Sequence, residues 1–323
     1  MLKEYSCSNM TYREIKTVGV VGTGLIGASW AAFFLARGFR VVATDPAPGA
    51  QARLRDFIGK AWPALNRLGA TAETAPPEPV FADSLEDCVL QADFIQESGP
   101  ERADIKREAY VKMDALAAPD VILASSTSGL RPSQLQQGCH HPGRILVGHP
   151  FNPPHIVPLV EVVGGAATDP AALDRAESFY KSLGKITIRV RRELTGHVSN
   201  RLQAALWREA YHLVASGVVT ASEVDAAIAH GPGLRWALMG PMLLGELGGG
   251  EGGLRHFLDH IGPLIERIWA EQGQTELTGE VKKTLVDSTN AEMAGLDTEA
   301  MLQERDALLV DLINAKAQAR NLP

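Results

Sequence analysis

Two residues near the middle of the chain have the types and spacing for proton transfer. His149 ends the apolar segment Arg144–Gly148, and Glu161 interrupts the apolar segment Pro158–Val163. A histidine ordinarily has a pKa near 6.5, so it can accept a proton at one stage of a reaction and return it at another. A buried carboxylate needs a partner, because an unpaired buried charge costs several kcal/mol. We predict that Glu161 orients His149 and stabilises its charged form; the alternative is a lone structural histidine.

The segment between these residues can bring them together. Pro150–Pro154 (PFNPP) reverses the chain, so Leu159–Val163 can return as an antiparallel strand beside Arg144–His149. Oxidising an alcohol with a nicotinamide requires removal of the hydroxyl proton as the hydride leaves the carbon. A dyad of this kind therefore favours a dehydrogenase, provided that the chain binds a dinucleotide.

A glycine-rich turn near the N-terminus predicts that cofactor. The β-branched run Val18–Val21 is typical of a buried strand, and Gly22, Gly24 and Gly27 follow at the G-x-G-x-x-G spacing before the helical segment Ala28–Ala36. Glycines at these positions permit a tight turn and close approach of a pyrophosphate to the free N–H groups of a helix. The alternative is a purely structural strand–turn–helix.

A carboxylate at the expected offset strengthens the prediction of a dinucleotide site. The next strand, Phe39–Thr44, ends in Asp45, which lies 23 residues after Gly22, close to the offset of roughly 20 expected for a ribose-binding acid. No arginine follows Asp45 directly, and a 2′-phosphate would meet a carboxylate there, so we expect NAD rather than NADP. The predicted cofactor-binding residues of this turn and strand end are Gly22, Thr23, Gly24, Leu25, Ile26, Gly27 and Asp45.

Further strands predict an open, mainly parallel sheet. Polar residues follow several strands, and ligands of such sheets bind beyond the carboxyl ends of the strands. The strand ends in question are Gly22, Asp45, Glu97-Ser98, Ser125–Ser128 and His149. The expected strands beyond the first two are Phe94–Ser98, Val121–Ser126, Arg144–His149, Leu159–Val163 and Lys185–Val190, with helices at Ala50–Leu68, Ala103–Leu116 and Asp169–Leu183 and a helix start capped by Ser84.

After Glu193 the strand patterns stop and helical patterns continue to the end. We predict a fold of class α/β: a Rossmann-type doubly wound sheet with mixed extra strands over residues 1–193, followed by an all-helical domain over residues 194–323. The expected helical features are a stripe from Val198 to Val214 ending at Gly217, a capping box at Thr220–Glu223, short helices in the glycine-rich Gly231–Gly253 and an amphipathic helix over Thr298–Ala319.

Composition excludes several classes of function. The net charge of −7 gives no indication of nucleic-acid binding. The sequence has no run of 18 apolar residues, so we expect no membrane span. Residues 1–16 are polar, lack the apolar centre of a secretion signal and are expected to form a loose arm. Cys7, Cys88 and Cys139 lack metal-ligand spacing and suit a reducing cytoplasm, so we expect a cytoplasmic protein without a metal.

The blocks VGTGLIG, ESGPERADIK, SSTSGL, HPFNPP with PLVEVVGG, and GHVSNRLQAALWREA resemble the 3-hydroxyacyl-CoA dehydrogenase superfamily over nearly the whole chain. The resemblance implies that His149 is the general acid/base, Glu161 its orienting carboxylate, and Ser128 the hydrogen-bond partner of the reacting oxygen. It also implies that Asn200 helps to position the substrate. Glu101 and Lys106 match positions near the cofactor ribose and nicotinamide; the alternative is a solvated charge pair.

Segments such as DFIQESGPER, SSTSGLRPS, ALWREA, GLRW and GGLRHF are most similar to the L-carnitine dehydrogenases, and next to the L-gulonate 3-dehydrogenases, the branch that includes the lambda-crystallins. One helix and the proline loop Gly69–Pro79 stand where acyl-CoA enzymes have a longer hairpin, which favours a free 3-hydroxy acid. The segment Gly240–Gly245 lacks the aromatic residues of carnitine enzymes, so Trp236, Phe151 and Trp207 are alternative faces for an ammonium group, with Glu246 as a counter-charge. Of these, Trp236 is expected to belong to a core rather than to such a face, and Arg235 either binds the substrate carboxylate or forms a helix-end salt bridge.

We therefore expect an NAD-dependent 3-hydroxy acid dehydrogenase. Carnitine is the first substrate, with L-gulonate or a short 3-hydroxyacyl-CoA as alternatives, and a crystallin-like structural protein is the non-enzymatic alternative. The resemblance also implies a homodimer formed through the helical domain. A lysine-based dehydrogenase is disfavoured, because His197–Gly217 contains no lysine.

Overall fold

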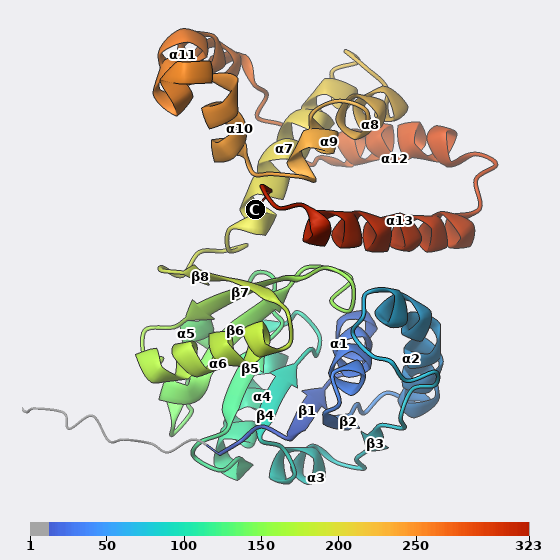
Figure 1. Cartoon of the computed structure of the whole chain (residues 1–323), viewed down its shortest axis with the longest axis vertical. Coiled ribbons are helices and arrows are strands. Elements are labelled where there is room, and N and C mark those ends of the chain that lie inside the picture. Colours follow the sequence, from blue (N-terminus) through green and yellow to red (C-terminus); the bar gives the residue numbers. More distant parts are fainter. Residues whose placement is uncertain (1–12, 323) are drawn as a thin grey trace, which may run out of the picture. The chain divides into compact units, whose positions relative to one another are not determined.

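A computed structural model describes residues 13–322. Most of the predicted N-terminal arm, with Cys7, lies outside these residues. The chain forms two compact units, one ending at Arg201 and the other beginning at Leu202, and Figure 1 shows the strands gathered in the first and helices alone in the second. An N-terminal doubly wound α/β domain and a helical C-terminal domain are thus confirmed, while the exact boundary near residue 193 stays a prediction.

The first unit is built on one eight-stranded sheet with the order β3-β2-β1-β4-β5-β6-β7-β8. Only the β6–β7 pair is antiparallel; the other six pairs are parallel. This is the mixed doubly wound arrangement that the sequence predicts. The strands are β1 (Thr17–Val21), β2 (Arg40–Thr44), β3 (Val80–Phe81), β4 (Phe94–Glu97), β5 (Ile122–Ser125), β6 (Ile145–Pro150), β7 (Leu159–Gly164) and β8 (Ile186–Val190).

Helices cover both faces of this sheet, because alternate strand residues point to opposite sides. Val18, Val20 and Phe94 pack with α1, α2 and α6 in one apolar cluster, while Ile95 and Leu123 pack with α3, α4 and α5 in a second. The helices are α1 (Leu25–Ala36), α2 (Ala50–Arg67), α3 (Leu85–Leu90), α4 (Ala103–Leu116), α5 (Pro132–Leu135) and α6 (Pro170–Ser182). Both faces of the sheet are therefore covered, and its carboxyl edge is where side chains can meet a ligand.

The described residues of the second unit, 202–322, form helices and no strand. They are α7 (Ser199–Ala215), whose first residues belong to the first unit, α8 (Ala221–Ala229), α9 (Pro232–Trp236), α10 (Pro241–Gly248), α11 (Gly253–Glu271), α12 (Gly279–Met293) and α13 (Thr298–Gln318). The Thr220–Glu223 capping box is confirmed, and Gly217 follows α7 with a positive φ of 72°. In the described part of the chain, no helix is both long and apolar enough to cross a membrane.

Three local expectations need correction. Helix α1 begins at Leu25, inside the glycine motif, because the motif itself forms the first turn. The short elements β3 and α5 were not expected, since two to four residues carry no periodic pattern. Finally, α13 is a helix, but its apolar side chains do not form one stripe, and only Val310 on it is buried.

Candidate active site

The centre of the site is the predicted dyad. The antiparallel register of β6 and β7 pairs His149 directly with Glu161, which places both side chains on the same face of the sheet. His149 Nδ1 lies 2.7 Å from Glu161 Oε2, and both side chains are buried, with 6% and 0% exposure. Because a carboxylate only accepts, the proton of neutral His149 is on Nδ1, and Nε2 keeps the lone pair that can take a proton.

Both oxygens of Glu161 are used. Oε1 accepts hydrogen bonds from the backbone N–H groups of Val198 and Ser199, at 2.9 and 3.0 Å, where α7 begins. Burial raises the pKa of the Glu161 carboxyl, but the hydrogen bonds from His149, Ser199 and Val198 outweigh burial, and the pKa is lowered. Glu161 is therefore the ionised partner that an imidazolium at His149 needs.

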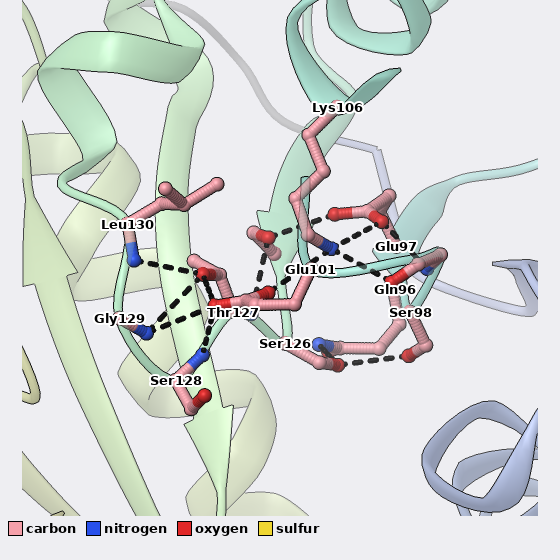
Figure 2. Close-up of polar contacts among 12 residues, drawn as sticks. Gln96, Glu97, Ser98, Glu101, Lys106, Ser126, Thr127, Ser128, Gly129 and Leu130 are labelled. Atoms are coloured by element: carbon pink, nitrogen blue, oxygen red, sulfur yellow. Dashed lines mark hydrogen bonds and ion pairs between the residues drawn. The ribbon is translucent and has the colours of Figure 1, made fainter. Parts of the chain in front are cut away.

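Ser128 lies in the turn after β5, the strand that pairs with the His149 strand β6. The Ser128 N–H donates to Glu101 Oε1 at 3.1 Å, and the Ser128 carbonyl accepts from Asn200 Nδ2 at 3.3 Å. Thr127 Oγ1 and the Gly129 N–H donate to the same Glu101 oxygen, at 2.5 and 3.0 Å. Figure 2 shows Glu101 reaching across to this turn, with the Ser128 hydroxyl directed away from it. The structure thus brings Ser128, Asn200 and Glu101 together and gives Glu101 a scaffolding contact in addition to its predicted role near the cofactor.

Lys106, which the resemblance places near the cofactor, forms a buried ion pair with Glu97. Its Nζ lies 2.7 Å from Glu97 Oε1 and 3.8 Å from Glu101 Oε2, and both Lys106 and Glu97 are only 2% exposed. Figure 2 shows the Lys106 ammonium group directed at Glu97. Glu97 also accepts from Ser125 Oγ at 2.8 Å and from the Gly99 N–H at 2.6 Å. The alternative of a solvated Glu101–Lys106 pair is wrong, because the first turn of α4 places the lysine over the buried end of β4. This network fixes the ends of β4 and β5 relative to each other.

Sequence reasoning missed one residue of this site, His197. Its side chain is 0% exposed, its Nε2 lies 3.1 Å from the Thr127 carbonyl oxygen, and its ring centroid is 5.2 Å from that of His149. Burial lowers the pKa of the His197 imidazole, and the hydrogen bond to Thr127 offsets this only in part. Two charged imidazoles at this separation would repel by about 3 kcal/mol at an effective dielectric constant of 20. His197 lies in the block GHVSNRLQAALWREA, but it precedes the helical stripe that begins at Val198, and no pattern in the sequence directs its side chain to Thr127.

The glycine turn fits a dinucleotide. A Cβ added at Gly27 would lie 1.8 Å from the Gly22 carbonyl oxygen, and Gly22 has a φ of +87°, so neither position accepts a side chain. At Gly24, by contrast, an added Cβ would meet no described atom within 4 Å, and no described side chain caps the N-terminus of α1 there. Open space in front of free helix N–H groups is the arrangement that binds a pyrophosphate. The residues present therefore fit NAD.

Asp45 lies at this turn. Its Oδ2 accepts from the Thr23 N–H at 2.7 Å, and its Oδ1 accepts from the Ala47 N–H at 2.8 Å. The carboxylate at the end of β2 is thus held against the glycine turn, and it would place a negative charge beside any 2′-phosphate.

The remaining predicted residues differ in their placement. Phe151 packs against His149, with ring centroids 6.5 Å apart and ring planes at 76°. Arg235 and Trp236 lie on α9 in the second unit, and their assignment to the substrate stays a prediction. Trp236 is 46% exposed, so it does not belong to a core within the described chain. Burial raises the pKa of the Cys88 thiol to about 12, which agrees with a packing role rather than a nucleophilic one.

Taken together, a glycine turn that accepts a pyrophosphate and a buried acid–histidine dyad at the same sheet edge define a nicotinamide-dependent dehydrogenase. Comparison with family models narrows the class. Residues 17–194 match the 3-hydroxyacyl-CoA dehydrogenase NAD binding domain, and residues 196–289 match the 3-hydroxyacyl-CoA dehydrogenase C-terminal domain. The chain belongs to the 3-hydroxyacyl-CoA dehydrogenase family and is an NAD-dependent oxidoreductase of that family.

Similar proteins extend over most of the chain. It is 47% identical to the L-carnitine dehydrogenase of Streptomyces griseus subsp. griseus over 94% of this chain and 90% of that protein. It is also 47% identical to the L-carnitine dehydrogenase of Pseudomonas aeruginosa, over 94% of each. Among solved structures, 5-formyl-3-hydroxy-2-methylpyridine 4-carboxylic acid 5-dehydrogenase, an NAD+ dependent dismutase, superposes with a TM-score of 0.82 at 31% identity over 95% of this chain and 100% of that one. Mycobacterium tuberculosis FadB2 gives 0.62 at 30% identity, over 79% and 89%.

Proposed function

We propose that this protein oxidises the 3-hydroxyl of L-carnitine to give 3-dehydrocarnitine, with NAD as the hydride acceptor. The buried His149–Glu161 dyad is the observation that carries the chemistry, since a structural protein has no need of a charge buried within a strand. The substrate is supported by the 44% and 47% identity to L-carnitine dehydrogenases from two Pseudomonas species.

The residues of the first unit divide the proton transfer between them. His149 Nε2 accepts the hydroxyl proton of the substrate while the hydride leaves the carbon, and the O–H electron pair forms the new carbonyl bond. Glu161 balances the charge that His149 acquires, and the N–H groups of Val198 and Ser199 keep the carboxylate in place. The Ser128 hydroxyl donates to the reacting oxygen, and Asn200 holds the Ser128 turn. Bound NAD supplies the hydride acceptor.

Gly24 and the helix N–H groups behind it would hold the pyrophosphate of the cofactor and Asp45 its ribose, while Gly22 and Gly27 permit the turn that brings them together. Lys106 and Glu101 would help to place the nicotinamide end, with Lys106 anchored by Glu97. Oxidation of the alcohol leaves the proton on His149, which then releases it to solvent. In the reverse reaction His149 donates the proton to the ketone oxygen.

We further propose that Arg235 pairs with the substrate carboxylate and that aromatic faces, Trp236 and Phe151 among them, receive the trimethylammonium group, each such contact being worth about 0.5–2 kcal/mol. A free hydroxy acid rather than a CoA ester is supported by the region between β2 and β3, where α2 and a loop of mostly exposed residues leave little surface for a CoA tail.

The experiment that tests this function is a substrate screen followed by NADH formation. Purified enzyme is given NAD with L-carnitine, L-gulonate, 3-hydroxybutyrate or 3-hydroxybutyryl-CoA at equal concentrations. We expect kcat/KM for L-carnitine to exceed that for the others by at least about 100-fold, equivalent to about 2.7 kcal/mol. A preference for gulonate or for the CoA ester would overturn the substrate, and absence of turnover with all four would favour the crystallin-like alternative.

We propose that the active form is a homodimer assembled through the second unit. Apart from Val214 and Val310, the large apolar side chains described there are not buried; Leu247 on α10 and Trp269 on α11 are 67% and 65% exposed. Exposed apolar faces of this extent mark a protein interface, and a second copy of the same chain is the partner proposed from the family resemblance. Light scattering should give twice the chain mass of 34.6 kDa, and Trp269→Lys should lower it. A monomer at micromolar concentration would contradict the proposal.

We also expect a cytoplasmic location. Cys88 and Cys139, the cysteines within the described residues, are both free thiols, as suits a reducing compartment. Cell fractionation tests this expectation.

A further inference from the structure

His197 occupies a position that few side chains adopt without cause. It is the one non-glycine residue with a positive φ among the described residues, at 49°, a conformation that costs free energy for most residues. The residues that follow it, Val198 and Ser199, direct their N–H groups at Glu161. The backbone at His197 therefore belongs to the support of the catalytic carboxylate, and the question is what its buried imidazole contributes.

The hydrogen bonds of the imidazole define its protonation state. The partner of Nε2 is a carbonyl oxygen, that of Thr127, which can only accept, so Nε2 carries a proton. Nδ1 is buried and has no hydrogen-bond partner among the described residues. A second proton on Nδ1 would be a buried donor without an acceptor, close to the ring of His149. The geometry therefore favours the neutral Nε2–H tautomer.

Charged groups around His197 agree with this state. His149 and Glu161 face it from β6 and β7, and Glu101 lies beyond Thr127. Glu101 is already engaged by the Ser128 turn, and Glu161 by His149 and two backbone N–H groups. Of the two carboxylates that act on His197, Glu161 is the buried one, and it can balance one imidazolium, the one formed at His149 during oxidation.

The peptide between Thr127 and Ser128 is held from both sides. Its carbonyl accepts from His197 Nε2, and its N–H donates to Glu101 Oε1 at 3.1 Å. This peptide sets the position of Ser128, while the backbone beside His197 holds Glu161. His197 thus connects the serine turn to the backbone that holds the acid of the dyad, beside the contact that Asn200 makes with the Ser128 carbonyl.

We propose that His197 is a positioning residue for the hydroxyl oxidation: as a neutral Nε2–H donor it holds the Thr127–Ser128 peptide so that Ser128 and His149 address the same substrate oxygen. The proposal rests on the proposed function, since it concerns the same site. Among the described residues, none of the hydrogen bonds of His197 goes to the glycine turn that binds the cofactor. The proposal therefore predicts that a change at His197 lowers turnover and leaves NAD binding unchanged.

The test compares three variants. His197→Phe keeps the ring and removes the donor, His197→Gln restores an N–H at the distance of Nε2, and His140→Phe makes the same change at an exposed position as a control. We expect His197→Phe to lower kcat with L-carnitine by about 10- to 100-fold with the Kd for NADH within about twofold of wild type. His197→Gln should return to within about fivefold, and the control should be unchanged. Equal loss in both His197 variants, or none in His197→Phe, would overturn the proposal.

A second measurement does not depend on the substrate or on the folding of a variant. Imidazole nitrogen chemical shifts of the wild-type protein report the tautomer and charge of each histidine. We expect His197 to be neutral with its proton on Nε2 from pH 6 to pH 9; a charged ring or an Nδ1–H tautomer at pH 7 would refute its role. Absence of carnitine turnover by the wild type would overturn the proposed function instead, and the variants would then be measured with the substrate that the screen identifies.

Discussion

Replacing Glu161 by glutamine tests whether the dyad works as described. The carboxylate accepts from His149 through one oxygen and from the Val198 and Ser199 N–H groups through the other. A glutamine amide has one accepting end only. If its oxygen faces the two backbone donors, its NH2 group faces His149 Nδ1, which must then accept. The proton moves to Nε2, and no lone pair remains to take the hydroxyl proton.

The opposite orientation is unfavourable as well. With the oxygen toward His149, the NH2 group would face two N–H donors, and hydrogen bonds from those donors to a charged group are worth about 1.5–3 kcal/mol each. In either orientation the imidazolium loses an attraction of about 4 kcal/mol, for unit charges about 4 Å apart at an effective dielectric constant of 20. We therefore expect kcat to fall roughly 100- to 10,000-fold, which corresponds to about 2.7–5.5 kcal/mol of transition-state stabilisation.

The assay is steady-state NADH formation with saturating NAD and L-carnitine, together with the Kd for NADH by fluorescence. Binding of NADH should stay within about threefold of wild type, because Glu161 does not contact the glycine turn. Glu78→Gln, which removes the charge of an exposed partner of Arg55, is the matched control and should change nothing. A Glu161→Gln enzyme that keeps kcat within tenfold would show that this carboxylate does not support the base.

Three further predictions concern the cofactor, the buried ion pair and a buried lysine. Asp45→Ala should raise the ratio of kcat/KM with NADP to that with NAD at least tenfold, because no carboxylate would then oppose a 2′-phosphate; an unchanged ratio counts against the assignment. Lys106→Met leaves Glu97 charged and unpaired, so chemical unfolding should show about 3–5 kcal/mol lower stability, and adding Glu97→Gln should recover part of it; no loss would contradict the pairing. Burial lowers the pKa of Lys185 to about 7, so the folded state loses this proton first and stability should rise with pH between about 7 and 10.5. The free energy of unfolding of Lys185→Met, measured in urea, should not rise over this pH range. An identical pH dependence in the variant and the wild type would refute the lowered pKa of Lys185.

Much of the site could be predicted from local patterns. The dyad was predicted at the carboxyl edge of a sheet from polar residues at strand ends, the glycine spacing and an acid that interrupts PLVEVV. The register of β6 and β7 confirms the pairing of His149 with Glu161. Such patterns succeed because strand periodicity fixes which side chains share a face.

The residues that sequence reasoning misjudged or missed depend on contacts between distant segments. Lys106 pairs closely with Glu97 at the end of β4 and only at 3.8 Å with Glu101. The acid that ends the buried strand FIQE was the available signal, by the same reasoning that singled out Glu161. His197 meets Thr127 across 70 residues, in a backbone conformation that no periodicity announces. Glu101 also holds the Ser128 turn in addition to its predicted role near the cofactor. That contact could be recognised only once the geometry of the turn was known.

The central claim is that the His149 imidazole takes the hydroxyl proton of the substrate. The most direct measurement is single-turnover NADH formation by His149→Gln at saturating NAD and L-carnitine, with NADH binding measured on the same preparation. We predict a rate at least about 1,000-fold below wild type, equivalent to about 4 kcal/mol, with NADH binding retained. A variant that binds NADH and turns over within tenfold of wild type would place the base elsewhere and contradict the account.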